Sequence, residues 1–130
     1  MKKELLDNNP ILKLTFDFSL MIIRYCEQLE NEKKFIIARQ LLKSGTSIGA
    51  NSIEAQNAES TSDFIHKFKI AAKEADETQY WLGLCEYAET YPDCKYLLDK
   101  LEEIQKVINS IIGTVKRKKT LSFLLSYFIL

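Results

Sequence analysis

Residues 44–64, SGTSIGANSIEAQNAESTSDF, decide the fold, because this stretch reads either as a ligand-binding loop or as a helix of small residues. Small and apolar side chains recur through it at steps of three and four residues: Ala38, Leu41, Gly45, Ile48, Ser52 and Ala55. That period is typical of one face of an α-helix, and it passes through both glycines without a slip. A structureless loop of this length is uncommon inside a compact domain. The sequence therefore predicts a helix through residue 56 and a turn at NAEST, residues 57–61.

The two glycines of this helix carry a structural prediction of their own. A glycine in a helix interior destabilises the helix by about 1 kcal/mol relative to alanine. We expect the close approach of a neighbouring backbone at Gly45 and Gly49 to offset that loss.

Three further helical stripes flank this segment. The first begins at Asn9-Pro10, a capping residue followed by one suited to the first helical position, and it comprises Ile11, Leu14, Phe18, Met21, Tyr25 and Leu29. The next begins near residues 60–62, where Ser60 and Asp63 form a capping box, and ends at Pro92. Its stripe comprises Phe64, Phe68, Ala71, Ala75, Thr78, Leu82 and Cys85. The last stripe follows Asp93 and comprises Leu97, Leu101, Ile104, Ile108, Ile111 and Val115.

Four amphipathic helices joined by short connections define the expected fold class. Short connections force consecutive helices to run antiparallel, which predicts an all-α, antiparallel up-down-up-down four-helix bundle. A chain of 130 residues is the size of a single domain. We therefore expect a bundle domain over residues 1–119 and an apolar C-terminal tail over residues 120–130.

A basic block and this apolar tail follow the fourth stripe. Residues 116–119 read KRKK, and residues 120–130 read TLSFLLSYFIL, a helix about half as long as a bilayer core is thick. Three arrangements are open for the tail. It folds back on its own bundle or on a neighbouring subunit, it anchors the protein at a membrane surface, or it is disordered.

Charge and cysteine content limit the function classes. Eighteen basic and eighteen acidic residues give no net charge, which argues against strong sequence-independent binding of nucleic acid but allows a local basic patch. The cysteines, Cys26, Cys85 and Cys94, are odd in number and widely spaced, as expected of reduced, packed thiols. The amino terminus lacks the apolar core of a signal peptide, and no apolar run reaches the ~20 residues of a membrane-spanning helix. We expect a cytoplasmic protein without a membrane span.

The residues that enzymatic chemistry requires are not assembled in the sequence. Gly45 and Gly49 lack the spacing and the lysine of a phosphate-binding loop. A di-iron bundle needs two Glu-x-x-His motifs, whereas His66 is the only histidine and is expected at a helix surface or interface. Glu74 and Glu77 fit a solvated helix face better than an acid–base pair. The sequence predicts no enzyme, no metal and no cofactor.

Two surfaces outside the core stripes carry interaction hypotheses. Ser47, Asn51 and Glu54 form a polar row opposite the core stripe of their helix, and such a row fits a solvated face. A second apolar band on the third helix comprises Tyr80, Trp81, Leu84, Tyr87, Ala88 and Tyr91. Because aromatic residues are enriched in interface cores, this band predicts self-association.

The ordered pair of helices that starts with the polar row resembles a known family. The pattern S-I-x-x-N-x-x-E at Ser47, Ile48, Asn51 and Glu54, followed by the acidic, alanine-rich residues 63–78, resembles the four-helix bundle proteins of the 23S rRNA-intervening sequence family. The likeness covers roughly Ile11 to Val115. Members of that family are encoded in inserts of bacterial large-subunit ribosomal RNA genes, or are related to proteins that are.

The resemblance implies an antiparallel bundle that assembles into a ring-like homopentamer, with no known enzymatic activity and no settled function. The similar accessory variability proteins of diversity-generating retroelements share the pentameric bundle and bind nucleic acid and a reverse transcriptase through basic surface. The family assigns no proven chemical role to the four motif residues. Many relatives read NIAEG where residues 51–55 of this chain read NSIEA, so packing there is expected to differ.

Two functions remain open at this point. In the first, the protein is an RNA- or ribonucleoprotein-associated adaptor that contacts nucleic acid through Lys116, Arg117, Lys118 and Lys119. A pentamer would present five copies of this block, and multivalency would strengthen weak contacts. In the second, the protein is purely a protein-binding scaffold that uses the apolar tail or the aromatic band with Trp81.

Overall fold

The computed structural model describes residues 1–129, most of which are helical. A short helix, α1 (Lys3–Asp7), precedes four long helices. These are α2 (Pro10–Asn31), α3 (Phe35–Ala55), α4 (Thr61–Tyr87) and α5 (Lys95–Ile129), and residues 1–129 contain no strand. The predicted all-α fold with four long helices is confirmed, and α1 is an addition that the sequence stripes do not predict.

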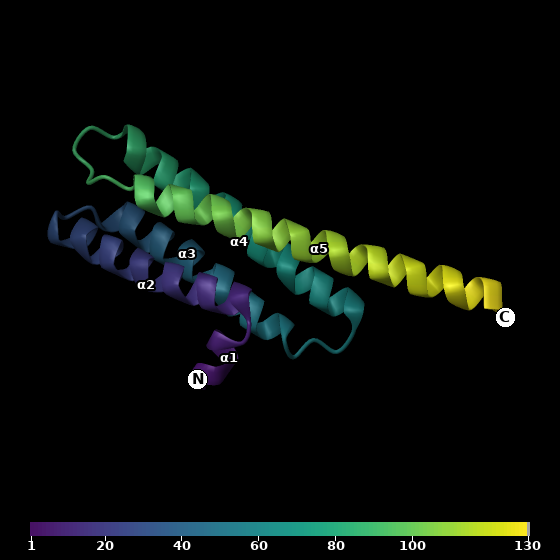
Figure 1. The fold of residues 1–130 in the computed structure, drawn as a ribbon. Coiled ribbons are helices and arrows are strands. Elements are labelled where there is room, and N and C mark those ends of the chain that lie inside the picture. The colour runs from purple at the N-terminus through teal and green to yellow at the C-terminus, as the bar shows by residue number, and fades with distance from the viewer. Residues whose placement is uncertain (130) are drawn as a thin grey trace.

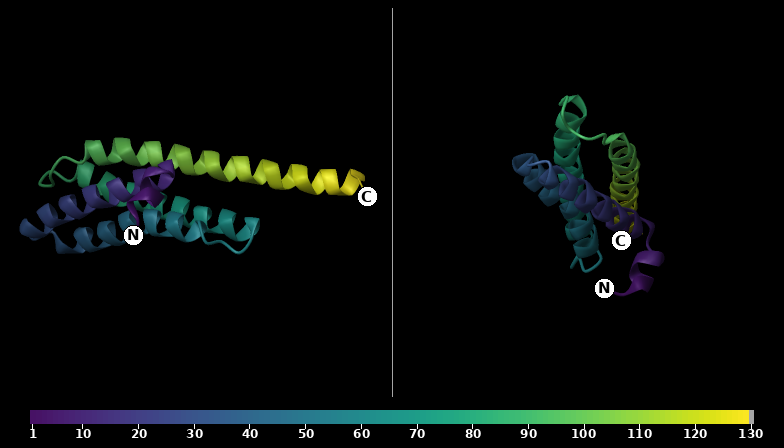
Figure 2. Two further views of the ribbon diagram at one scale, coloured as in Figure 1. Left: turned by 60° about the horizontal axis from the view of Figure 1, so that its bottom comes forward. Right: turned by 90° about the vertical axis from the view of Figure 1, so that its left-hand side faces the viewer.

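The four long helices form a bundle in which consecutive helices run in opposite directions (Figure 1). Both α2 and α4 contact α3 and α5, so the helices close a ring around one core. The contacts that α3 makes with α2 and α4 are the most extensive of the bundle. The bundle therefore centres on α3, while the C-terminal half of α5 extends well beyond the other helices (Figure 2).

Side-chain hydrogen bonds lie at the starts of α4 and α2, where the sequence predicts capping residues. The Ser60 hydroxyl accepts a hydrogen bond from the backbone N–H of Asp63 at 3.0 Å, so α4 starts at the predicted capping box. Asn9 precedes α2 as predicted, but its side chain does not cap that helix. The Asn9 amide donates instead to the Gln56 side chain at 3.3 Å, and this hydrogen bond connects the start of α2 to the end of α3.

Most positions of the predicted stripes line the core, whereas Leu14, Met21, Phe64, Ile111 and Val115 are only partly buried. On α3 all six predicted positions are buried, namely Ala38, Leu41, Gly45, Ile48, Ser52 and Ala55. On α2 the buried face is wider than the predicted stripe and adds Leu12, Thr15, Ile22 and Cys26. α2 is covered on more sides than the other long helices, because it contacts α1 as well as α3 and α5.

Gly45 and Gly49 bring α2 and α3 into close contact. A β-carbon added to Gly45 would lie 3.0 Å from both Cγ1 and Cγ2 of Ile22, a fully buried residue of α2. A β-carbon added to Gly49 would lie 3.3 Å from the Thr15 hydroxyl oxygen and 3.5 Å from the Thr15 carbonyl oxygen. A backbone atom therefore approaches Gly49 as expected, whereas at Gly45 the close neighbour is the Ile22 side chain and not a backbone. Each absent side chain makes room for α2.

Buried hydroxyl groups connect α3 to α4. The side-chain oxygens of Ser44 and Thr78 lie 2.9 Å apart in a hydrogen bond, and both residues are fully buried. The Thr78 hydroxyl also lies 2.7 Å from the Glu74 carbonyl oxygen. A core polar group that loses its partner costs about 1–3 kcal/mol, so the Ser44–Thr78 pair favours one register of α3 against α4.

The end of α4 differs from the prediction. The sequence predicts an end at Pro92, whereas α4 ends at Tyr87 and Ala88 is already extended. The Tyr25 hydroxyl of α2 donates to the Pro92 carbonyl at 2.7 Å and anchors the loop that follows α4. The prediction that the whole aromatic band lies on one helix is therefore wrong, because Ala88 and Tyr91 belong to this loop.

The basic block and the apolar tail continue α5 without a break. α5 runs through residues 116–119 to Ile129, and the side chains of residues 116–128 are exposed. Residues 120–128 project from the bundle and do not fold back on it (Figures 1 and 2). The last residue of the predicted tail, Leu130, lies outside the described residues.

Replacing two helical glycines by alanine should change stability in opposite directions. At Gly45, overpacking against Ile22 typically costs about 1–3 kcal/mol and outweighs the gain of about 1 kcal/mol in helix propensity. At Gly83 of α4, an added β-carbon meets nothing within 4 Å, so Gly83→Ala should gain up to about 1 kcal/mol. Denaturant unfolding of the two variants measures both effects. Equal shifts in the same direction would show that the α2–α3 contact does not depend on glycine.

Candidate functional site

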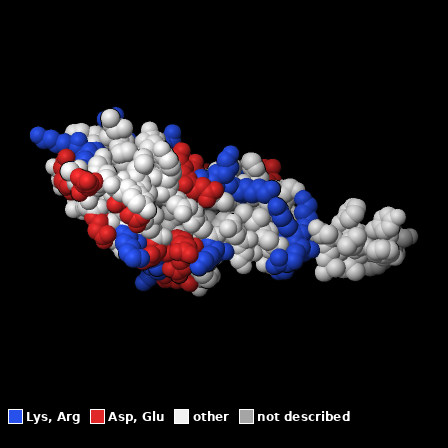
Figure 3. Space-filling view, turned by 90° about the horizontal axis from the view of Figure 1, so that it is seen from above, with Lys and Arg blue, Asp and Glu red and all other residues white. Residues whose placement is uncertain are grey.

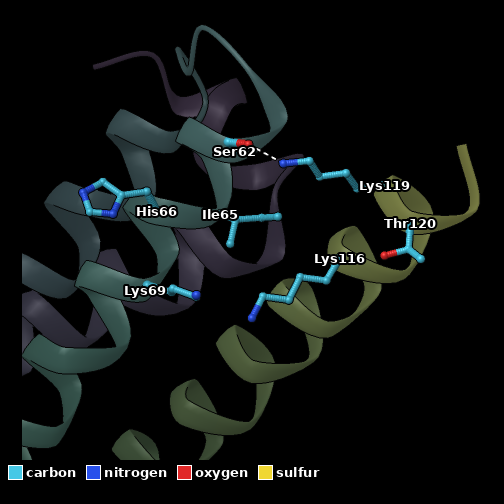
Figure 4. A pocket seen from close by; sticks show the side chains of 7 residues that line it. All are labelled: Ser62, Ile65, His66, Lys69, Lys116, Lys119 and Thr120. Atoms are coloured by element: carbon cyan, nitrogen blue, oxygen red, sulfur yellow. Dashed lines mark hydrogen bonds between the residues drawn. The ribbon is translucent and has the colours of Figure 1, made fainter. Parts of the chain in front are cut away.

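A cleft between α4 and α5 is lined by several basic side chains. It has a volume of about 410 Å³ and lies where the first turns of α4 face the basic block of α5. We call it the basic cleft, and it is lined by Ser62, Ile65, His66 and Lys69 of α4 and by Lys116, Lys119 and Thr120 of α5. Figure 4 shows Lys69 and Lys116 pointing toward each other across the cleft, with Ile65 on its floor.

The ammonium groups of the basic cleft lie close enough to influence one another. The pKa of Lys116 is lowered, because its amine contacts the Lys69 side chain and is exposed to that positive charge. The Lys119 ammonium donates a hydrogen bond to the Ser62 hydroxyl across the cleft. No Asp or Glu is among the residues that line the cleft. The cleft is therefore a concentration of positive charge that an anion would neutralise.

The structure divides the predicted nucleic-acid contact, residues 116–119, between two sides of α5. Lys116 and Lys119 line the basic cleft, whereas Arg117 and Lys118 do not. The Arg117 guanidinium donates to the Thr114 hydroxyl at 3.3 Å within its own helix. All four side chains are exposed, and basic side chains gather beside the base of the projecting end of α5 (Figure 3).

Sequence reasoning offers Lys69 only as one of several scattered lysines, with Lys67 and Lys73, and does not predict that α4 meets the basic block. Ser62, His66 and Lys69 recur at steps of four and three residues, so they share one face of α4. That spacing is visible in the sequence, but only the pairing of α4 with α5 brings this face to the basic block. His66 lies at a helix surface, as expected, and its ring turns away from α5 (Figure 4).

The family-motif residues lie on α3, and their polar contacts are structural. Ile48 is fully buried in the core. The Ser47 hydroxyl donates to the Lys43 carbonyl at 2.7 Å, and the Asn51 amide donates to the Ser47 carbonyl at 2.9 Å. Glu54 forms a 3.3 Å ion pair with Lys67 of α4. None of these residues lines the basic cleft.

The aromatic band leaves a discontinuous apolar surface on α4. Tyr80 and Tyr87 are 61% and 86% exposed, and Leu84 lies between them at 40%. Trp81 is half-buried and meets the Tyr80 ring edge to face at a centroid distance of 5.2 Å. The buried indole N–H of Trp81 has no hydrogen-bond partner in the described part of the chain.

The three cysteines lie in the core and do not form a reactive site. All three are buried and free. Burial raises the pKa of the Cys26 thiol to about 12 and that of Cys94 to about 11, and it also raises the pKa of Cys85. A reactive cysteine needs a lowered pKa and access to solvent, so these thiols have the properties of core residues.

Other candidate chemical groups are dispersed. The pKa of the half-buried Glu74 carboxyl is raised, mainly by burial and also by repulsion from Glu77. Within residues 1–129, His, Cys, Asp and Glu side chains do not gather in any group of three that could hold a metal ion. None of the described helices is long and apolar enough to cross a bilayer.

These features define an all-helical bundle protein with a basic cleft at one end, and the comparisons place it in a family. Residues 7–110 match the family model described as 23S rRNA-intervening sequence protein, and the chain belongs to this family. A protein of unknown function from the S23 ribosomal protein family of Bacteroides thetaiotaomicron VPI-5482 has a similar crystal structure, with 41% sequence identity and a TM-score of 0.75. That match covers 78% of this chain and 97% of the other. No curated protein matches the chain.

The buried thiols predict slow alkylation of the native protein. Near pH 9.0, the ordinary pKa of a thiol, an exposed cysteine is half ionised, whereas the raised pKa keeps Cys26 and Cys94 protonated. Iodoacetamide should therefore modify the native protein at pH 9 far more slowly than the guanidinium-unfolded protein, as followed by mass spectrometry. Rapid modification of any cysteine in the native protein would contradict this account of the core.

Proposed function

We propose that this chain is a non-enzymatic, self-associating bundle protein of the cytoplasm that acts as an RNA- or ribonucleoprotein-associated adaptor. The observation that carries the proposal is the basic cleft with its adjoining block, residues 116–119, exposed at one end of the bundle. In this reading residues 1–119 are the folded adaptor domain, and residues 120–130 are an appended tail. The family name, which refers to ribosomal RNA, supports the choice of RNA.

The electrostatics of the site support contact with phosphate groups. Lysine is a common phosphate ligand because its compact ammonium donates several hydrogen bonds to phosphate oxygens. Lys116 and Lys119 form no ion pair with a carboxylate of the described residues, so their charges are available to a ligand. Because the net charge is zero, binding would depend on this local basic surface. It would be sensitive to salt, because it rests on neutralising phosphates.

Exposed apolar side chains support the self-association part of the proposal. Tyr80, Leu84 and Tyr87 form an exposed surface on α4, and Ile36 at the start of α3 is 80% exposed. Aromatic side chains of this kind are enriched in the centres of protein interfaces. We propose a homopentamer, the assembly that the family resemblance implies, because it would bring five basic clefts into one particle.

A protein-binding scaffold is the second candidate function, and the projecting tail favours it. Phe123 and Phe128 are 70% and 79% exposed on the C-terminal end of α5, which projects beyond the other helices (Figure 2). Large exposed apolar surfaces are typical of sites that bind another protein or a membrane. In this alternative the aromatic band with Trp81, or the tail, would hold a protein partner and the basic cleft would have no ligand.

Sedimentation velocity with fluorescently labelled ribosomal RNA fragments tests both parts of the proposal. The protein alone should sediment as an assembly larger than a monomer at micromolar concentration. At low salt the RNA should co-sediment, and replacing residues 116–119 by glutamine should abolish this binding because each neutralised phosphate contributes a share of the affinity. The variant should keep the native mass, since these side chains are exposed.

Two outcomes would contradict the proposal separately. A monomer at micromolar concentration would remove the self-associating assembly. Free sedimentation of the RNA at low salt, or equal binding by the glutamine variant, would remove the adaptor function and leave the scaffold.

A further inference from the structure

The face of α5 that lines the basic cleft continues past the end of the bundle, where no other described helix covers it. Steps of four, three and four residues lead from Lys116 to Thr120, Phe123 and Tyr127, so these side chains share one face of the helix. α4 begins at Thr61, and the described chain covers α5 no further in this direction. Phe123 and Tyr127, which we call the aromatic ridge, are 70% and 71% exposed.

The opposite face of α5 has a different chemistry. Lys118, Leu121 and Leu125 lie roughly half a turn away from the cleft residues, because each residue advances the helix by about 100°. Leu121, Leu125 and Phe128 are 58%, 52% and 79% exposed, so this side is apolar and also uncovered. The two sides of the projecting helix therefore differ. Phe123 and Tyr127 lie in line with the cleft, whereas Leu121, Leu125 and Phe128 lie on the other side.

The basic cleft has the donor set of a phosphate site. Lys69, Lys116 and Lys119 supply three ammonium groups, and Ser62 and Thr120 add hydroxyls. Lys69 and Lys116 are like charges that point toward each other across the cleft (Figure 4), and no lining carboxylate balances them. A phosphate group placed there would neutralise both ammonium charges and accept hydrogen bonds from the hydroxyls.

The aromatic ridge distinguishes between forms of nucleic acid. Exposed aromatic rings beside lysines are typical of surfaces that bind single strands, in which unpaired bases stack on the rings. In an RNA duplex the bases are already stacked and paired, and proteins recognise mainly its shape, its phosphates and its 2′-hydroxyls. The ridge therefore offers favourable contacts to a single strand that a duplex cannot use.

We propose that the basic cleft and the aromatic ridge together bind single-stranded RNA. One backbone phosphate lies between Lys69, Lys116 and Lys119, and neighbouring unpaired bases stack on Phe123 and Tyr127. This inference rests on the proposed RNA-adaptor function, and it adds the form of the RNA and the residues that select it.

Fluorescence anisotropy with the full chain tests the inference, with an oligouridine and an RNA duplex of equal length as probes. The oligouridine should bind more tightly than the duplex. The double variant Phe123→Leu, Tyr127→Leu should bind the oligouridine about tenfold more weakly, because it cannot stack with bases but stays apolar, and should bind the duplex unchanged. The double variant Lys69→Gln, Lys116→Gln should lower the salt dependence, with a log–log slope smaller by about 0.7 for each phosphate that the variant no longer neutralises.

Matched controls separate the cleft from its surroundings. Lys118→Gln removes the same charge as Lys116→Gln but outside the cleft, so it should affect binding less. The double variant Leu121→Ala, Leu125→Ala removes apolar surface from the opposite face and should leave oligouridine binding unchanged. All the substituted residues of α5 are exposed, and circular dichroism of each variant checks that the helices are retained.

The contrary outcomes are distinct. Equal affinity for the two probes, or full binding by the Phe123→Leu, Tyr127→Leu variant, would overturn the single-strand inference and leave the RNA-adaptor function standing. No binding of either probe at low salt would overturn both. Binding to vesicles containing phosphatidylserine that displaces the oligouridine and is abolished by Leu121→Ala, Leu125→Ala would assign the projecting helix to a lipid surface instead.

Discussion

The contact between α2 and α3 is the constraint on which the rest of the bundle depends. Gly45 has no side chain, and the position that its β-carbon would take is only 3.0 Å from two carbons of the buried, β-branched Ile22. Glycine weakens an isolated helix, so its presence in α3 is explained by what lies against it. Because α3 also makes extensive contact with α4, the spacing of α2 and α3 influences where the other helices lie.

The functional end of the molecule follows from this arrangement and from unequal helix lengths. The hydrogen bond between Ser44 and Thr78 fixes α4 against α3, and α4 in turn positions the side of the basic cleft that carries Lys69. α5 pairs with α4 but continues far past its first residue, Thr61. The basic block therefore lies at the end of the bundle. Lys116 and Lys119 face α4, Arg117 and Lys118 do not, and the helical turns of residues 120–128 are exposed.

Sequence periodicity predicted the helices and their buried faces because that information is local. The unbroken steps through Gly45 and Gly49 predicted both a continuous α3 and a close neighbour. Contacts between distant segments account for what the sequence did not reveal. The early end of α4 involves the bond from Tyr25 to the Pro92 carbonyl, and the cleft depends on the register that brings Lys69 to the basic block. An apolar stripe predicts the buried side of a helix, but the packing of the neighbouring helices determines which exposed residues lie close together.

A double-mutant cycle between Gly45→Ala and Ile22→Ala tests the central claim most directly, with unfolding free energies from denaturant titration. Beside Ile22, Gly45→Ala should destabilise the protein by about 1 kcal/mol, since overpacking exceeds the propensity gain. In the Ile22→Ala background the clashing carbons are gone, and the same change should become stabilising by up to about 1 kcal/mol. An equal loss in both backgrounds would show that close packing of α2 on Gly45 is not what holds the bundle in this arrangement.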